Sequence, residues 1–292
     1  MLFACDLQSN RVTCDLQVKR RSTIEDSETP EVLVIPGAWT RVSAFSDVRE
    51  TLDSAGFSSR LVELPARSRK LPQLDRGGLR AIDDLLDREI AACSSPPVLV
   101  GHSLGGLASL RAAKRTPVHA LVLLMPAHPR GMLPIVAGIS VRDSVNALRL
   151  LGTTLSVTGM SRFVDRVAPN RVPSIVPRGL YSSHMTPEQL REALIHRVDE
   201  SWTVLLEVAV GSRQPIEPVG VPTLLVAGLQ DHITATQALR PLAGELGASF
   251  IEVDVAHAFN EEPSFTLVTD AIVEFMNGPH LRAWSAAMPT RA

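Results

Sequence analysis

The chain has 292 residues, of which 45% are hydrophobic and 21% are charged, and its formal net charge is -2. This composition is that of an ordinary globular protein, long enough for one large domain or for a core that carries an inserted segment. The near-neutral charge gives no general attraction to nucleic acid or to an anionic membrane, and no uncharged apolar run is long enough to cross a bilayer. We therefore expect neither a nucleic-acid partner nor a membrane partner.

The three cysteines, Cys5, Cys14 and Cys93, are odd in number and lie at none of the usual metal-ligand spacings. They predict neither a complete disulfide framework nor a zinc site, and they favour a reducing compartment. The first residues lack a basic start followed by an apolar run, so they do not resemble a secretory signal. The expected location is the cytoplasm.

The N-terminal segment contains one short echo, Ala-Cys-Asp-Leu-Gln at 4–8 and Thr-Cys-Asp-Leu-Gln at 13–17, separated by the turn-forming pair Ser9-Asn10. Two paired strands are the simplest interpretation. The polar and charged residues from 20 to 30 then predict a connecting loop.

Beyond residue 30, short runs of β-branched and leucine residues alternate with amphipathic stretches. Such runs are typical of strands buried on both faces of a parallel sheet, and the amphipathic stretches are typical of helices. The predicted strands are 32–35, 59–62, 98–100, 120–124, 223–227 and 249–253, and the predicted helices include 44–55, 77–92 and 107–114. With the two N-terminal strands, they predict an α/β fold whose eight-stranded, mostly parallel sheet is flanked by helices.

Residues 130–215 interrupt this alternation with helical periodicity and several prolines. We expect them to form a lid inserted between the sixth and seventh strands of a core made of residues 1–129 and 216–292. Apolar residues near helical spacing in the lid would either roof an apolar substrate or seat the lid on the core. Its positive charges could meet an anionic group or simply face solvent. They include Arg162, Arg166, Arg171 and Arg178.

The strongest motif is Gly-His-Ser-Leu-Gly-Gly at 101–106, a G-x-S-x-G pattern between a predicted strand and a predicted helix. A serine presented from a tight strand-to-helix turn needs neighbours without a Cβ atom. The N-terminus of the following helix adds partial positive charge near a developing oxyanion. The bare pattern occurs by chance in about one chain in ten of this length, but its setting removes most accidents. We predict that Ser103 is a nucleophile.

On this motif the chain resembles the α/β-hydrolase superfamily, over nearly its whole length except the lid. Residues 34–39, Val-Ile-Pro-Gly-Ala-Trp, follow the third predicted strand, where that family usually has His-Gly-x. The resemblance implies an oxyanion hole formed by the N–H groups of Ala38 and Leu104. Pro36 stands where the family has histidine. In the family that histidine is a supporting residue, so the replacement affects the expected loop conformation and not the chemistry. The Gly-Ala-Trp stretch is similar to that of small-ester hydrolases such as plant methyl esterases, and Trp39 is a candidate substrate contact.

A neutral serine hydroxyl needs a histidine within hydrogen-bond reach, and that histidine needs a carboxylate on its other nitrogen. The family order along the chain is serine, acid, histidine. Asp231 follows the seventh predicted strand in a polar turn and His257 follows the eighth in a loop, so they resemble the family's acid and base. An acid directly after the sixth strand is excluded, because no Asp or Glu occurs between Leu124 and Asp143.

Other histidines and acids near these motifs have simpler interpretations. The side chain of His102 should point away from the nucleophile, and His232 is a loop neighbour of the acid. Glu252 and Asp254 alternate out of their strand and should face solvent or a helix. His128, after the sixth predicted strand, should lie at the carboxyl edge of the sheet near the pocket and is a candidate substrate contact.

Together these residues predict a serine hydrolase that cleaves an ester or thioester of a small, largely apolar molecule through an acyl-enzyme on Ser103. Such chemistry requires no metal and no organic cofactor. Two alternatives stay open: an acyltransferase or natural-product cyclase that uses the same three residues, and a non-covalent ligand-binding or proton-transfer protein on the same fold. The sequence does not indicate an oligomeric state.

Overall fold

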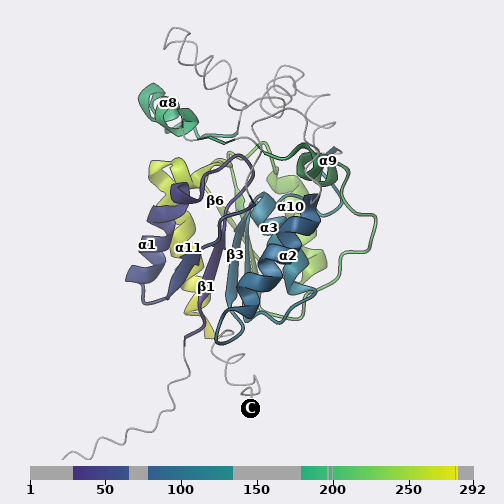
Figure 1. Cartoon of the computed structure of the whole chain (residues 1–292). Helices are drawn as coiled ribbons and strands as arrows, with labels where there is room; N and C mark the ends of the chain where they lie inside the picture. The colour runs from purple at the N-terminus through teal and green to yellow at the C-terminus, as the bar shows by residue number, and fades with distance from the viewer. Residues whose placement is uncertain are drawn as a thin grey trace, which may run out of the picture.

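The computed structural model describes residues 29–65, 78–133, 179–195, 197–198, 200–279 and 281. In these residues six strands form one sheet in the order β2-β1-β3-β4-β5-β6 (Figure 1). The strands are β1 (Val32–Ile35), β2 (Ser59–Leu61), β3 (Val98–His102), β4 (Ala120–Leu124), β5 (Thr223–Gly228) and β6 (Ser249–Val253). Every neighbouring pair is parallel, so all six strands end at the same edge of the sheet.

The six core strands predicted from the sequence are all present, and β1, β3, β4 and β5 are fully buried as their apolar runs predict. The prediction that β2 and β6 are also buried on both faces was wrong. Both lie at the edges of the sheet, where a strand has one neighbour instead of two, and their residues are partly exposed. The two strands predicted at 4–8 and 13–17 lie outside the described residues, so the described sheet has six strands where eight were expected.

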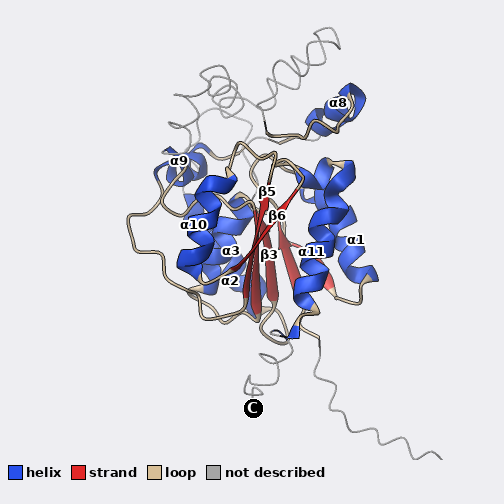
Figure 2. Ribbon diagram, turned by 180° about the vertical axis from the view of Figure 1, so that it is seen from behind, coloured by secondary structure: helices blue, strands red, loops and turns tan. Residues whose placement is uncertain are grey.

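Helices cover both faces of the sheet (Figures 1 and 2). One face carries α1 (Ser46–Ser54) and α11 (Thr266–Met276), and the other carries α2 (Gly78–Ala91), α3 (Leu104–Ala113) and α10 (Thr236–Leu246). Short 3-10 helices precede α1 and α11: η1 (Val42–Phe45), η3 (Phe259–Glu261) and η4 (Pro263–Phe265). Helix α3 begins three residues earlier than predicted, directly after Ser103, and this start matters for the site.

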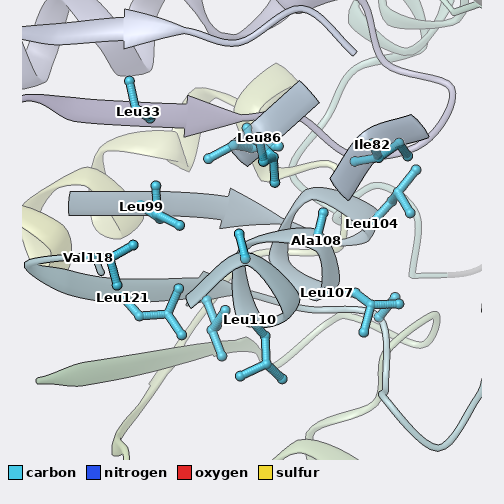
Figure 3. Packing of buried hydrophobic residues seen from close by; sticks show 14 of the residues in the cluster. Leu33, Ile82, Leu86, Leu99, Leu104, Leu107, Ala108, Leu110, Val118 and Leu121 are labelled. Carbon is cyan, nitrogen blue, oxygen red and sulfur yellow. The ribbon is translucent and has the colours of Figure 1, made fainter. Parts of the chain in front are cut away.

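The core consists of two apolar layers, one on each side of the sheet. Alternate residues of a strand point to opposite faces, so Leu33 and Leu99 pack toward α2 and α3, whereas Val32 and Val98 pack toward α1 and α11. Figure 3 shows the first layer, in which Ile82 and other helix residues lie against the strand leucines. These two layers hold the strand ends, and therefore the loops that follow them, in fixed positions.

The described parts of the predicted lid, residues 130–215, contain α8 (Pro187–Ile195) and α9 (Trp202–Val210). Both helices lie beyond the edge at which the strands end (Figures 1 and 2). Most of the remaining segment, including the four arginines named above, lies outside the described residues. No helix in the described part of the chain is long and apolar enough to cross a membrane.

Candidate active site

Ser103 occupies the turn between β3 and α3. Its backbone has a φ of 52°, which is unusual for a residue with a side chain and marks a strained turn. The turn is held from both sides, since the Ser103 N–H donates to Leu124 O (3.0 Å) and the Ser103 carbonyl accepts from Ala127 N–H (2.9 Å) and Leu107 N–H (3.1 Å). The side chain is partly exposed. The strained backbone thus presents a hydroxyl at the edge where the strands end.

The glycines around Ser103 lie where a larger side chain would collide with backbone or with a buried hydroxyl. A Cβ atom on Gly105 would lie 2.3 Å from Ile35 O and 2.5 Å from Pro36 O, and one on Gly101 would lie 2.4 Å from Gly105 O and from Ser109 Oγ. These separations are far below van der Waals contact. The G-x-S-x-G pattern therefore allows the turn to pack directly against the loop that follows β1.

His257, in the loop after β6, is brought beside Ser103. Its Nε2 atom is 3.0 Å from Ser103 Oγ, and its Nδ1 atom is 2.8 Å from Asp231 Oδ2. The histidine and Asp231 are buried. The structure therefore brings together the three residues predicted from the sequence, in a line of two hydrogen bonds that starts at a serine hydroxyl.

Asp231 is fixed by four hydrogen bonds in the turn after β5. Its Oδ1 atom accepts the N–H groups of Ile233 (2.7 Å) and Thr234 (2.9 Å), and its Oδ2 atom accepts Thr234 Oγ1 (2.7 Å) as well as His257. Burial by itself would raise the pKa of Asp231, but the nearby His257 and the hydrogen bonds from His257 and Thr234 outweigh it and lower the pKa. A carboxylate held in this way stays ionised and fixes the orientation of the imidazole. The contribution of Thr234 was not predicted from the sequence.

Ala38 and Leu104, the two residues predicted to form an oxyanion hole, belong to segments beside Ser103. Leu104 is the first residue of α3, so its N–H has no partner inside the helix. The loop of Ala38 packs on the nucleophile turn, because a Cβ atom on Gly37 would lie 3.1 Å from Ser103 Cβ. Among the described residues, neither the Ala38 N–H nor the Leu104 N–H has a hydrogen-bond partner. The loops of both residues predicted to form an oxyanion hole therefore adjoin Ser103, and their role stays a prediction.

The other predicted residues lie in these loops but have partners of their own. The carbonyl of Trp39 accepts the Val198 N–H (3.0 Å), and Trp39 has a φ of 58°. His128 is partly buried, and its Nδ1 atom accepts the Arg130 N–H (3.1 Å) in the loop after β4. Contact of either side chain with a substrate stays a prediction.

His102 bonds to the backbone of His257. It is buried, and its Nε2 atom lies 2.8 Å from the His257 carbonyl oxygen, so the ring is bonded to the His257 backbone and not to the Ser103 hydroxyl. Burial, followed by the proximity of His257, holds the pKa of His102 well below its usual value of 6.5. His102 is therefore neutral and donates this hydrogen bond. Glu252 and Asp254 are exposed, as the sequence predicts, and His232 is exposed in the loop beside Asp231.

The described part of the chain has no cluster of three histidine, cysteine or carboxylate side chains that could hold a metal ion.

A group of hydrogen-bonded side chains beside the site was not predicted from the sequence. It is formed by Thr40, Tyr181, Arg197 and Glu261. These residues carry no motif and come from distant parts of the chain. The Tyr181 ring packs in a small apolar cluster, and its hydroxyl bonds to Arg197 and Glu261.

Comparison with known proteins identifies the family and the fold. Residues 32–270 match the model of the Alpha/beta hydrolase family. The search of curated proteins gives no match. Among solved structures, the chain is similar to a thermophilic esterase from Thermogutta terrifontis, with a TM-score of 0.61 and 19% identity over 86% of this chain and 90% of the esterase.

Two further solved structures show the same fold. The monoacylglycerol lipase of Paleococcus ferrophilus has a TM-score of 0.57 and 19% identity over 85% of this chain and 95% of the lipase. The thioesterase domain from the curacin biosynthetic pathway has a TM-score of 0.54 and 18% identity over 85% of this chain and 91% of that domain. At these identities the likeness is one of fold. Because the family model matches well over half of the sequence, this chain belongs to the alpha/beta hydrolase family.

Proposed function

We propose that the chain is a serine hydrolase that cleaves a carboxylic ester or thioester of a small, largely apolar molecule through an acyl-enzyme on Ser103. The observation that carries the proposal is the unbroken line from Ser103 Oγ to His257 Nε2 (3.0 Å) and from His257 Nδ1 to Asp231 Oδ2 (2.8 Å). A buried carboxylate at the end of such a line makes the imidazole a base for the hydroxyl.

The proposed reaction has two halves. Ser103 Oγ attacks the substrate carbonyl carbon while His257 Nε2 takes the hydroxyl proton, and the resulting oxyanion accepts hydrogen bonds from the N–H groups of Ala38 and Leu104. Collapse breaks the bond to the alcohol or thiol, which leaves with the proton from His257. Water then gives a proton to His257 and attacks the acyl-enzyme, and the acid is released as Ser103 regains its proton. The reaction needs no metal and no organic cofactor, and a cytoplasmic location remains a prediction.

The substrate class is supported by the family and by the predicted lid. Structures with the same fold include an esterase, a lipase and a thioesterase domain, all of which act on acyl groups by their names. Residues 130–215 would form the lid, with α8 and α9 beyond the strand ends where Ser103 lies. Trp39, next to Ala38, and His128, next to the residue that binds the Ser103 carbonyl, are the proposed substrate contacts.

The proposal is tested by intact-mass analysis after exposure to a fluorophosphonate, with hydrolysis of short and medium nitrophenyl esters followed in parallel. Wild type should gain one phosphonyl group and turn over esters, and Ser103→Ala should do neither. Ser54→Ala, at the exposed end of α1, is the matched control and should behave as wild type. Labelling without ester turnover would instead point to acyl transfer, and absence of labelling in wild type would refute a covalent serine mechanism.

A further inference from the structure

A buried arginine from the predicted lid contacts the loops around Ser103, His257 and Asp231, which we call the triad, without bonding to the triad itself. Arg197 is 7% exposed, and its guanidinium donates to three side chains. Nη1 donates to Thr40 Oγ1 (3.0 Å), Nε and Nη2 donate to the Tyr181 hydroxyl (3.2 and 2.9 Å), and Nη2 donates to Glu261 Oε2 (2.5 Å). We call these four residues the Arg197 cluster.

The positive charge of Arg197 is paired with a carboxylate of the protein itself, Glu261. Burial by itself would lower the pKa of Arg197, but the adjacent Glu261 carboxylate raises it, so the guanidinium stays charged. The Glu261 side chain is 9% exposed and also accepts the Tyr181 hydroxyl (3.0 Å). A buried ion pair is costly to form unless hydrogen bonds satisfy both partners, and here they do. Arg197 is thus poorly placed to receive an anionic substrate group, and its contacts must be explained by the residues that it holds.

On one side, the Arg197 cluster fixes the loop that carries the proposed oxyanion donor. Thr40 Oγ1, which accepts from Arg197, donates in turn to the carbonyl of Ala38 (3.1 Å). Thr40 and Arg197 also pair as an isolated antiparallel bridge, and the Val198 N–H donates to the Trp39 carbonyl (3.0 Å). Trp39, which has a φ of 58°, is therefore restrained by residues 197–198, both through its own carbonyl and through the neighbouring Thr40. This arrangement orients residues 38–40 relative to the rest of the site.

On the other side, the same cluster is joined to the loop of the proposed base. Glu261 lies four residues after His257, and its N–H donates to Ala258 O (3.0 Å). The His257 and Ala258 N–H groups donate to the carbonyls of Gly179 (3.0 Å) and Leu180 (2.8 Å), directly before Tyr181. One guanidinium thus connects the oxyanion loop, the histidine loop and two segments of the predicted lid.

We propose that Arg197 is a positioning residue that, through Thr40, sets the Ala38 N–H against the oxyanion formed at Ser103. This inference rests on the proposed function. We call the hydrogen bonds from Arg197 to Thr40 and from Thr40 to the Ala38 carbonyl the relay. Loss of the relay should lower kcat, because the oxyanion exists only during the reaction, and should leave KM nearly unchanged. A residue that bound substrate directly would raise KM instead.

The decisive comparison is Thr40→Val against Thr40→Ser. Valine keeps the shape of threonine but removes the hydroxyl that links Arg197 to the Ala38 carbonyl, whereas serine keeps the hydroxyl. Thr40→Val should lower kcat on the order of ten- to a hundredfold, less than the roughly 10²- to 10³-fold lost when an oxyanion donor is removed outright. Thr40→Ser should stay close to wild type, and KM should change by less than about twofold in both.

Arg197→Lys supplies a second measurement at the other end of the relay. Lysine keeps the charge opposite Glu261 but lacks the planar fork that reaches three partners at once, so kcat should fall here too. The matched control is Arg111→Lys, which alters an arginine on α3 that pairs with Asp83 of α2 (2.5 Å). This variant should keep the wild-type kcat. Melting curves of every variant establish that it is folded, and if Arg197→Lys does not fold, the Thr40 pair decides alone.

The rate of fluorophosphonate labelling at Ser103 distinguishes failure of the proposed function from failure of the positioning role of Arg197. If wild type is not labelled, the proposed function fails and this inference fails with it. If wild type is labelled and folded Thr40→Val is slower than Thr40→Ser in labelling and in kcat, the positioning role is supported. Equal kcat in the two Thr40 variants, or a rise in KM with unchanged kcat, would overturn the role of Arg197 while leaving the hydrolase proposal intact.

Discussion

Replacing Asp231 by asparagine tests the triad through the tautomer of His257. Asp231 Oδ1 accepts two backbone N–H groups, from Ile233 (2.7 Å) and Thr234 (2.9 Å), and an NH2 group cannot take that place. The amide oxygen must therefore occupy the Oδ1 position, and the NH2 group must face Thr234 Oγ1 and His257 Nδ1. Thr234 can adapt, because its hydroxyl also lies 3.2 Å from Met125 O and can donate there.

His257 cannot adapt in the same way. With an NH2 group 2.8 Å away, Nδ1 must accept a hydrogen bond, and the ring proton moves to Nε2. Nε2 then donates to Ser103 Oγ and can no longer take its proton. Serine hydrolases with this defect lose about 10⁴-fold in kcat. At about 1.4 kcal/mol for each factor of ten, Asp231→Asn should raise the barrier by roughly 5 kcal/mol with little change in KM.

The assay is steady-state hydrolysis of a nitrophenyl ester together with the rate of fluorophosphonate labelling. The control is Asp254→Asn, an exposed carboxylate after β6 whose Oδ1 accepts Gln230 Nε2 (2.8 Å) and which should keep full activity. The reasoning would be refuted if Asp231→Asn kept more than about a tenth of the wild-type kcat. It would equally be refuted if Asp254→Asn lost as much activity as Asp231→Asn.

Three further predictions concern the surroundings of the triad. Gly105→Ala should lower the free energy of unfolding by about 1–3 kcal/mol and abolish activity, because the new Cβ atom meets the backbone of the β1 loop; Gly244→Ala on α10, with no atom within 4 Å, is the control and should not destabilise. Because His102 is neutral when buried, the folded chain does not bind the proton that the unfolded chain takes up below pH 6.5. The free energy of unfolding should therefore fall by up to about 1.4 kcal/mol per pH unit below that value. Denaturant titrations repeated at several pH values should show that the free energy of unfolding depends less steeply on pH in His102→Gln than in wild type. Glu207→Ala removes the carboxylate that accepts the Leu79 N–H (2.6 Å) at the start of α2 and should cost about 1 kcal/mol of stability in a denaturant titration, and a fall in kcat would contradict this purely structural role.

Much of the fold could be predicted because its signals are local. Runs of β-branched and leucine residues predict the buried strands, and Ser103 is found because a strand, a tight turn and a helix follow one another within about a dozen residues. Asp231 and His257 follow strands in the order that the resemblance implies. What local patterns do not contain is the position of a strand in the sheet, so the partial exposure of β2 and β6 was missed.

The Arg197 cluster could not be predicted for the same physical reason. Arg197 and Thr40 are 157 residues apart, and Glu261 is 64 residues beyond Arg197. Each is an ordinary polar residue in its local sequence, with no neighbour that marks it as buried. Only the chain's path in three dimensions brings a charged side chain from the predicted lid into contact with the loops after β1 and β6. Thr234 was missed likewise, since its role depends on the geometry of the turn at Asp231.

Backbone strain in the described residues is concentrated where the proposed chemistry occurs. Trp39, Ser103 and Met125 are the non-glycine residues there with positive φ, at 58°, 52° and 42°, and they follow three neighbouring strands, β1, β3 and β4. Each such conformation costs on the order of 1–3 kcal/mol, so each must be held by its surroundings. The N–H groups of Ser103 and Met125 bind carbonyls of the next strand (3.0 and 2.8 Å), the Met125 carbonyl lies 3.2 Å from Thr234 Oγ1, and the Trp39 carbonyl accepts the Val198 N–H.

These restraints come from different parts of the molecule. The sheet holds Ser103 and Met125, the turn at Asp231 adds a bond to Met125, and residue 198 of the predicted lid binds the Trp39 carbonyl. Because two buried layers fix the strands themselves, the Ser103 hydroxyl and the proposed N–H donors are held in place by the fold. Donors fixed in advance stabilise a developing oxyanion without reorganisation during the reaction. Loosening the contact made by residues 197–198 of the predicted lid should therefore lower the catalytic rate even though Ser103, His257 and Asp231 are unchanged.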